Sequence, residues 1–204
     1  MARILGIAGS LRAGSFNTAL LRTAQELAVP GVELELATLH GIPLYDGDLE
    51  AREGLPPAVQ ALKARVLASD ALLLATPEYN NGIPGVFKNA IDWLSRPAAD
   101  IARVFGDKPF ALVGASPGGF GTILSQNHWL PVLKTLGVQL WAGNRLMVSR
   151  AGSAFDADGE LVDAKLREQL AGFAQAAATF AAARRRRPGG PASPPAAALA
   201  CCRG

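Results

Sequence analysis

Short apolar runs alternate with helical patterns along most of the chain, and this alternation restricts the possible folds more than any other feature. Strands are expected over residues 3–8, 32–39, 71–75, 109–115 and 138–148, the last interrupted near Gly143. Helices are expected over residues 15–28, 56–68, 85–94, 125–136 and 163–183. Strands that alternate with helices need right-handed crossovers, which predicts a parallel sheet covered on both faces.

Five such strands favour an α/β, doubly wound parallel sheet of the flavodoxin-like type, with strand order 2-1-3-4-5 and helices on both faces. In this winding a ligand sits at the carboxyl ends of strands 1 and 3. Residues 40–54 are rich in Gly, Pro and Asp and are expected to form a long connection without regular structure. We interpret residues 1–183 as one domain.

The turn after the first strand is suited to binding an anion. Ser10, Ser15, Asn17 and Thr18 offer neutral donors where a helix begins, and Arg12 offers a planar fork that can hold a phosphate. Ser and Asn also stand before many helices simply as N-caps, and the cap and the anion site share the same physics. Both readings remain open at this point.

The same turn excludes two common phosphate loops. It lacks the Lys of a nucleoside-triphosphate loop, and Gly6, Gly9 and Gly14 do not have the spacing of a dinucleotide fingerprint. Hydroxyl groups gathered at one turn better fit a single terminal monophosphate.

A second stretch follows the third strand. Two prolines stiffen it, Gly82 permits a close approach, and an aromatic ring and two amides are available to contact a heterocycle. Its candidate binding residues are Pro77, Glu78, Tyr79, Asn80, Asn81 and Gly82.

A third stretch follows the fourth strand and is rich in glycine, so that a flat ring could lie against a bare backbone. Its candidate residues are Ser116, Pro117, Gly118 and Gly119. Three such loops leave strands 1, 3 and 4 at the same edge of the sheet, which predicts one shared site.

These stretches resemble the signatures of the NAD(P)H-dependent FMN reductases, a group that includes chromate-, quinone- and azo-reducing flavoproteins. Residues 9–17 are similar to the family's G-S-x-R-x-x-S-x-N phosphate loop. Residues 77–80, 83–85 and 88–93 are similar to its second signature, and residues 116–119 to its third. The resemblance runs in order from about Arg3 to Phe180.

The resemblance implies a flavodoxin-like enzyme that binds FMN without a covalent bond. Ser10, Arg12, Ser15, Asn17 and Thr18 would hold the phosphate. Residues 77–82 would line the isoalloxazine ring with Tyr79 and Asn80 nearest, and residues 116–119 would flank its other side. Gly82 departs from the family, because many members carry a serine there, and one hydroxyl contact is therefore missing.

The implied reaction is a ping-pong transfer of electrons from NADPH or NADH through FMN to a flavin, quinone, azo, nitro or chromate acceptor. The flavin would perform the chemistry, so no protein side chain is assigned as catalytic. The resemblance also implies a homodimer or homotetramer, with the helices at 85–94 and 125–136 packing across the two-fold axis. We interpret Asp92 and Trp93 as a charge and an aromatic anchor at that interface.

The basic character of the chain lies in its last residues. The formal net charge is +3, but residues 184–204 hold five arginines and no acidic residue, which leaves 15 basic and 17 acidic residues in the body. This arginine-, proline- and glycine-rich tail is expected to be disordered. We expect neither a nucleic-acid nor a membrane partner, and a cytoplasmic location, because no leader or apolar run of membrane-spanning length is recognisable.

Three other functions compete with this interpretation. An FMN electron carrier would share the site but would not use NAD(P)H. A receiver-type signalling domain would need an acidic magnesium pocket where this chain has Ser10, Thr76 and Pro77. A nucleic-acid binder would depend on the tail. No metal site is predicted, since His40 and His128 are isolated.

Overall fold

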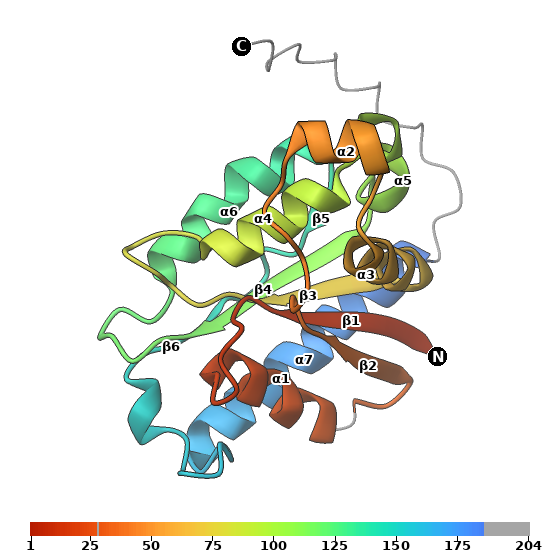
Figure 1. Ribbon diagram of the computed structural model, residues 1–204. Coiled ribbons are helices and arrows are strands. Elements are labelled where there is room, and N and C mark those ends of the chain that lie inside the picture. Colours follow the sequence, from red (N-terminus) through yellow and green to blue (C-terminus); the bar gives the residue numbers. More distant parts are fainter. Residues whose placement is uncertain (28, 186–204) are drawn as a thin grey trace.

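A parallel sheet runs through the middle of the molecule (Figure 1). The structure is a computed structural model of the 204-residue chain and describes residues 1–27 and 29–185. The path β2-β1-β3-β4-β5 confirms the predicted α/β class and strand order, and a sixth strand, β6, also pairs with β4. The strands are β1 (Ala2–Ala8), β2 (Val32–Ala37), β3 (Ala71–Ala75), β4 (Pro109–Ala115), β5 (Gln139–Leu140) and β6 (Leu146–Val148).

Helices cover both faces of the sheet, as predicted (Figure 1). One face packs against α1 (Phe16–Glu26) and α7 (Ala164–Arg185). The other packs against α3 (Pro57–Ala68), α4 (Gly85–Leu94) and α6 (Ile123–Thr135).

The sequence of the central strand β3 is apolar throughout, and every residue of the strand is buried. Leu73 packs into the core under α1 and α7, while Leu72 and Leu74 pack into the core under α3, α4 and α6. A strand buried on both faces has no polar side to alternate with. The core therefore consists of two layers separated by the sheet.

The predicted fifth strand is two short strands. β5 ends at Leu140 and β6 begins at Leu146, which confirms the interruption near Gly143. Each pairs in parallel with a different part of β4, so β6 brings a further strand end to the carboxyl edge of the sheet.

The segment expected as an irregular connection contains a helix, α2 (Gly47–Glu53), so that expectation is wrong for its second half. The Asp46 carboxylate accepts hydrogen bonds from the backbone N–H groups of Asp48 and Leu49, and Gly54 ends the helix with a φ of 76°. These are ordinary start and stop signals. Further short helices are η1 (Ala98–Asp100), α5 (Ile101–Val104) and η2 (Ala151–Ser153).

The last helix extends slightly beyond its predicted end, to Arg185. The predicted tail over 184–204 lies outside the described residues from position 186 onward. Among the helices that the structure describes, none has the length and apolar character needed to cross a membrane.

Trp93 is not at the surface, which contradicts its interpretation as an interface anchor. It is 0% exposed within the chain, and its Nε1–H donates to the Pro43 carbonyl at 2.9 Å. Asp92 forms an ion pair with Lys88 one helical turn away, at 2.7 Å. Trp93 therefore anchors the loop before α2 to the core.

A buried lysine joins α3 to the segment between α4 and β4. Lys63 Nζ, in a residue only 5% exposed, donates to the Arg96 carbonyl at 2.5 Å and to Asp100 Oδ2 at 2.6 Å. Hydrogen bonds from Lys63 and then from Arg103 lower the pKa of Asp100 below its usual 3.8. The folded state therefore binds a proton at Asp100 less readily than the unfolded chain does.

We expect the stability from Asp100 to be complete above the unfolded pKa and lost as pH falls through the lower folded pKa. Urea unfolding should thus show the wild type more stable than Asp100→Asn at neutral pH, with the difference shrinking below about pH 4. Asp92→Asn, which breaks a half-exposed pair, should change stability little. A difference between wild type and Asp100→Asn that persists unchanged to pH 2 would contradict this account.

Candidate functional site

The three predicted loops meet at a hollow of about 200 Å³ that is open to solvent. It lies at the carboxyl ends of β1, β3 and β4. Nine of the residues predicted from sequence line it: Ser10, Arg12, Ser15, Asn17, Pro77, Glu78, Tyr79, Ser116 and Pro117. Thr18, Asn80, Asn81, Gly82, Gly118 and Gly119 belong to the same loops without lining this hollow.

The turn between β1 and α1 presents donors toward the hollow. Ser15 is the N-cap of α1, and its hydroxyl accepts a hydrogen bond from the Thr18 backbone N–H at 3.3 Å. Ser10 Oγ accepts from the Arg12 backbone N–H and from the Tyr79 hydroxyl, each at 3.2 Å. A hydroxyl oxygen has two lone pairs, so the remaining capacity of Ser10 is to donate its own O–H. The turn is both a capped helix start and a set of donors suited to an anion.

Gly9 lets the turn lie directly on the core. Its backbone N–H donates to the Ala75 carbonyl at 2.9 Å, which continues the β1–β3 pairing. A Cβ at this position would stand 2.8 Å from Phe87 Cε1 and 2.9 Å from Pro77 Cδ. Phe87 is fully buried and cannot move aside easily. A side chain at position 9 would therefore push the turn away from β3.

Asn17 braces two of the loops against each other. Its Nδ2–H donates to the Ala115 carbonyl at 2.8 Å, and its Oδ1 accepts from the Ala115 backbone N–H at 2.9 Å. The residue is only 3% exposed. Its side chain thus holds α1 to the end of β4, a contact between residues 98 positions apart that the sequence did not predict.

The second loop closes as a tight hairpin turn. Tyr79 and Gly82 exchange two backbone hydrogen bonds of 3.2 and 3.0 Å, and Asn80 and Asn81 between them have φ values of 49° and 62°. Two consecutive positive φ values are typical of a type I′ turn, which asparagine tolerates well. The asparagines, not Gly82, therefore take the left-handed positions. A Cβ on Gly82 would meet Tyr79 and His128 only at ordinary distances of 3.7 and 3.9 Å.

Glu78 ties this loop to α6. Its Oε2 accepts hydrogen bonds from the backbone N–H groups of Leu124 and Ser125 at 2.8 and 3.0 Å. A carboxylate at a helix N-terminus is stabilised by the unpaired N–H groups and the helix dipole. The charge of Glu78 is thus already engaged by the protein, although the residue borders the hollow.

The third loop is fixed to the end of β6 and the segment that follows it. The Ser116 backbone N–H donates to the Val148 carbonyl at 2.9 Å, and the Arg150 backbone N–H donates to the Gly118 carbonyl at 3.0 Å. Within the described chain, no atom lies within 4 Å of where a Cβ of Gly119 would stand. The backbone at Gly118 and Gly119 is therefore open for a flat group to approach.

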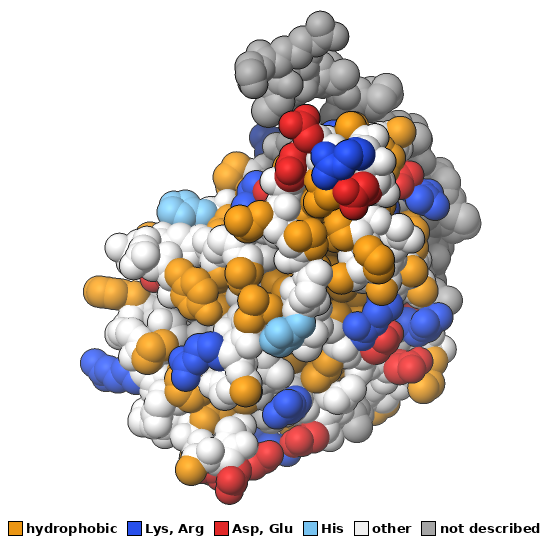
Figure 2. Space-filling view, in the orientation of Figure 1, with side chains coloured by type: hydrophobic (Ala, Val, Ile, Leu, Met, Phe, Trp, Pro, Cys, Tyr) orange, Lys and Arg blue, Asp and Glu red, His pale blue; other side chains and the backbone are white. Residues whose placement is uncertain are grey.

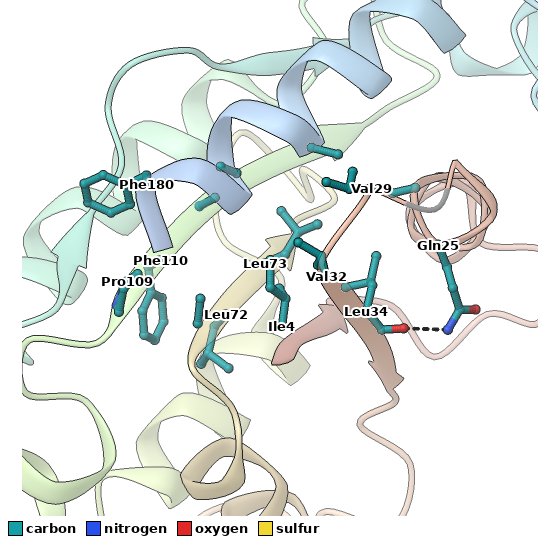
Figure 3. A pocket seen from close by; sticks show the side chains of 15 residues that line it. Ile4, Gln25, Val29, Val32, Leu34, Leu72, Leu73, Pro109, Phe110 and Phe180 are labelled. Atoms are coloured by element: carbon teal, nitrogen blue, oxygen red, sulfur yellow. Dashed lines mark hydrogen bonds between the residues drawn. The ribbon is translucent and has the colours of Figure 1, made fainter. Parts of the chain in front are cut away.

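A second hollow, of about 50 Å³, lies at the opposite end of the strands (Figure 3). Sheet residues such as Ile4 and Leu73 face α7 across it. The side-chain amide of Gln25 donates a hydrogen bond to the Leu34 carbonyl at 2.6 Å. Its lining is almost entirely aliphatic or aromatic. It offers no set of donors for an anion, so the candidate site is the hollow at the carboxyl ends. No cluster of His, Cys, Asp and Glu among the described residues could hold a metal ion.

Two lining residues were missed from the sequence, Phe16 and Ala115. Phe16 stands between two predicted residues, and Ala115 directly precedes Ser116, so including the neighbours of each signature would have found both. The end of β6 at the same edge of the sheet was also missed, because residues 138–148 were predicted as one interrupted strand and not as two strands.

Comparisons with known proteins agree with this geometry. The profile of a family described as NADPH-dependent FMN reductase matches residues 2–153. An NAD(P)H-dependent FMN reductase of Pseudomonas aeruginosa is 49% identical over 166 residues, which is 81% of this chain and 88% of that protein. A quinone reductase of Escherichia coli K12 is 34% identical over 181 residues, 87% of this chain and 94% of that protein.

Among solved structures, the flavoenzyme FerB of Paracoccus denitrificans, an NAD(P)H:(acceptor) oxidoreductase, superposes with a TM-score of 0.80 and 34% identity. The match covers 90% of this chain and 99% of that one. These findings confirm the resemblance drawn from the three signature stretches.

Proposed function

Because the chain belongs to the NADPH-dependent FMN reductase family, we propose that it is an FMN-containing oxidoreductase that uses NAD(P)H to reduce quinone-type acceptors. The observation that carries this proposal is the meeting of three loops at one hollow beside the N-terminus of α1. Quinones are the proposed acceptors because several of the similar proteins, the Escherichia coli relative among them, are named as quinone reductases or quinone oxidoreductases.

The residues around the hollow fit FMN. The N-terminus of α1, the hydroxyl of Ser10 and the guanidinium of Arg12 suit the phosphate. The open backbone at Gly118 and Gly119 and the hairpin at Tyr79 suit a flat ring.

When bound, FMN supplies the two-electron exchange between nicotinamide and acceptor. The protein binds and orients the reactants. Hydroxyl and backbone N–H donors fix the phosphate end, and the loops at 77–82 and 116–119 border the ring. No side chain is proposed as nucleophile or general base. Tyr79 and Asn80 are proposed nearest the ring, although the Tyr79 hydroxyl itself bonds to Ser10.

We propose that reductant and acceptor use the same open side of the site in turn. Double-reciprocal plots of the steady-state rates at several acceptor concentrations should then give parallel lines, as in a ping-pong mechanism. Intersecting lines would argue for separate binding sites for reductant and acceptor. Free flavin, azo dyes, nitroaromatics and chromate belong to the proposed acceptor range beside quinones, with turnover measured for each with NADPH and with NADH.

Anaerobic mixing with NADPH tests the function itself. The purified protein should be yellow, should lose its flavin colour on mixing with NADPH under nitrogen, and should regain it when a quinone is added. A yellow protein that NADPH does not bleach would instead be an FMN electron carrier. A colourless protein that cannot be reconstituted with FMN would refute the proposal.

Arg12→Ala should weaken FMN binding roughly 10- to 100-fold, because hydrogen bonds to charged groups contribute about 1.5–3 kcal/mol. Fluorescence quenching of FMN on titration with apoprotein measures this. Arg22→Ala is the matched control, an exposed arginine on α1 that does not line the hollow. Equal affinities of the two variants would show that Arg12 does not contact the phosphate.

Assembly as a homodimer or homotetramer is part of the same proposal. Ile123, Leu124 and Leu130 on α6 are each about two-fifths exposed. These groups favour contact with a second copy through α4 and α6. Sedimentation velocity would measure the state. A cytoplasmic location and the absence of nucleic-acid and membrane partners stay predictions.

A further inference from the structure

The loop after β4 is held in place by backbone contacts and exposes one aromatic side chain to solvent. The loop is held by the bonds of Ser116 to Val148 and of Gly118 to Arg150. Gly121, with a φ of 63°, lies so close to β6 that a Cβ would stand 3.1 Å from the backbone of Met147. Between these anchors, Phe120 is 84% exposed. A large apolar ring held out beside a ligand site is suited to stack on a flat partner.

Arg150 joins this loop from the neighbouring strand end. Its backbone N–H donates to Gly118, and its carbonyl accepts from the backbone N–H and the hydroxyl of Ser153 at 3.0 and 2.9 Å. Its φ of 48° is left-handed, a conformation that is unfavourable for a long side chain. The backbone is thus fixed while the guanidinium is exposed. Backbone conformations of this kind cluster at functional sites.

The strand ends that carry this pair lie at the left edge of the molecule, where hydrophobic and basic side chains are prominent in Figure 2. Arg12 stands at the turn after β1, where the N-terminus of α1 suits one phosphate. Arg150 stands beyond β4, at the far side of the third loop. Arg150 lies outside the lining of the hollow and offers a second cation for a phosphate on a ligand that extends past the third loop.

We infer that Phe120 and Arg150 bind the adenosine 2′-phosphate end of NADPH, with the adenine stacked on Phe120 and the 2′-phosphate held by Arg150. This inference rests on the proposed function and specifies which nicotinamide it uses. A planar guanidinium can hold a phosphate through two parallel hydrogen bonds, and aromatic rings stack on bases of any kind. A neutral quinone carries no phosphate for Arg150 to hold, whereas NADPH does. The pair therefore suits the reductant better than the acceptor.

Calorimetric titration of the purified protein with NADP⁺ and with NAD⁺ tests Arg150. Arg150→Gln should weaken NADP⁺ binding about tenfold and leave NAD⁺ within about twofold, since only the former offers a 2′-phosphate. Arg52→Gln, an exposed arginine on α2 at another edge of the molecule, is the control and should change neither. Unchanged NADP⁺ binding in Arg150→Gln, or an equal loss for both nucleotides, would overturn the assignment.

Phe120 should show a different pattern. Phe120→Ala should weaken both nucleotides about tenfold, and Phe120→Trp should restore binding, because stacking does not depend on the 2′-phosphate. Loss that Trp does not restore would overturn the stacking role.

The two proposals can fail separately. Binding of NADP⁺ that depends on Arg150 in a protein that takes up no FMN would reject the oxidoreductase and keep the nucleotide site. The opposite result is a yellow protein that NADPH bleaches, with an Arg150→Gln variant that keeps the wild-type preference between NADPH and NADH. That result would keep the oxidoreductase and reject the nucleotide site.

Discussion

We expect Gly9→Ala to reduce the free energy of unfolding by about 2–3 kcal/mol and to leave the purified protein largely without FMN. The added methyl group would overlap Phe87 and crowd Pro77, both of which are buried. The ring of Phe87 also packs edge-on against Trp129, with 5.1 Å between the ring centroids. We therefore expect the turn to move and the core to stay in place. Displacing the turn moves Ser10 and the start of α1 together.

Urea unfolding and the ratio of flavin to protein absorbance measure the two effects. Gly14→Ala is the matched control, because it lies in the same turn and a Cβ there would have no described atom within 4 Å. This control should keep both stability and FMN. If the two alanine variants behave alike, the close packing of Gly9 is not what sets the position of the turn.

The second large effect is expected for Asn17→Ala. The substitution removes two buried hydrogen bonds and leaves the N–H and C=O of Ala115 without their partner. Unsatisfied buried groups cost about 1–3 kcal/mol each, so a loss of about 2–6 kcal/mol of stability is expected for the two. FMN affinity should fall as well, because α1 and the third loop would no longer be joined.

Asn17→Asp keeps a side chain of the same size but removes the N–H donor, so it tests whether the hydrogen bonds of Asn17 or only its volume stabilise the protein. An ionised aspartate can accept from the Ala115 N–H but has nothing to donate to its carbonyl, so it should be nearly as destabilising as alanine. Asn127→Ala, which removes an exposed amide on α6 that accepts from Arg145, serves as control and should shift the unfolding midpoint little. A wild-type midpoint for Asn17→Asp would contradict the two-bond account.

The parallel sheet, its order and the two helical layers could be predicted because their signals are local and repeated. Continuous apolar runs mark strands buried on both faces, and Leu72 to Leu74 behave in this way. The three loops could be placed together because the winding brings the ends of strands 1, 3 and 4 to one edge. Nine predicted residues line one hollow for that reason.

What could not be predicted depends on partners distant in sequence. Asn17 was assigned to a phosphate because its type and position suit one, but its partner Ala115 is visible only in three dimensions. Trp93 was placed at an interface because the sequence does not show the Pro43 carbonyl that receives its N–H. The helix α2 had a readable signal, the capping Asp46, that the surrounding Gly and Pro residues obscured.

The bonds of Ser10 to Tyr79 and of Asn17 to Ala115 link all three loops within the protein chain itself. The binding site is therefore preorganised before a ligand binds, so little conformational entropy of the protein is lost on binding. Loading and release of the cofactor should then leave the architecture intact, and stripped protein should accept fresh cofactor without refolding.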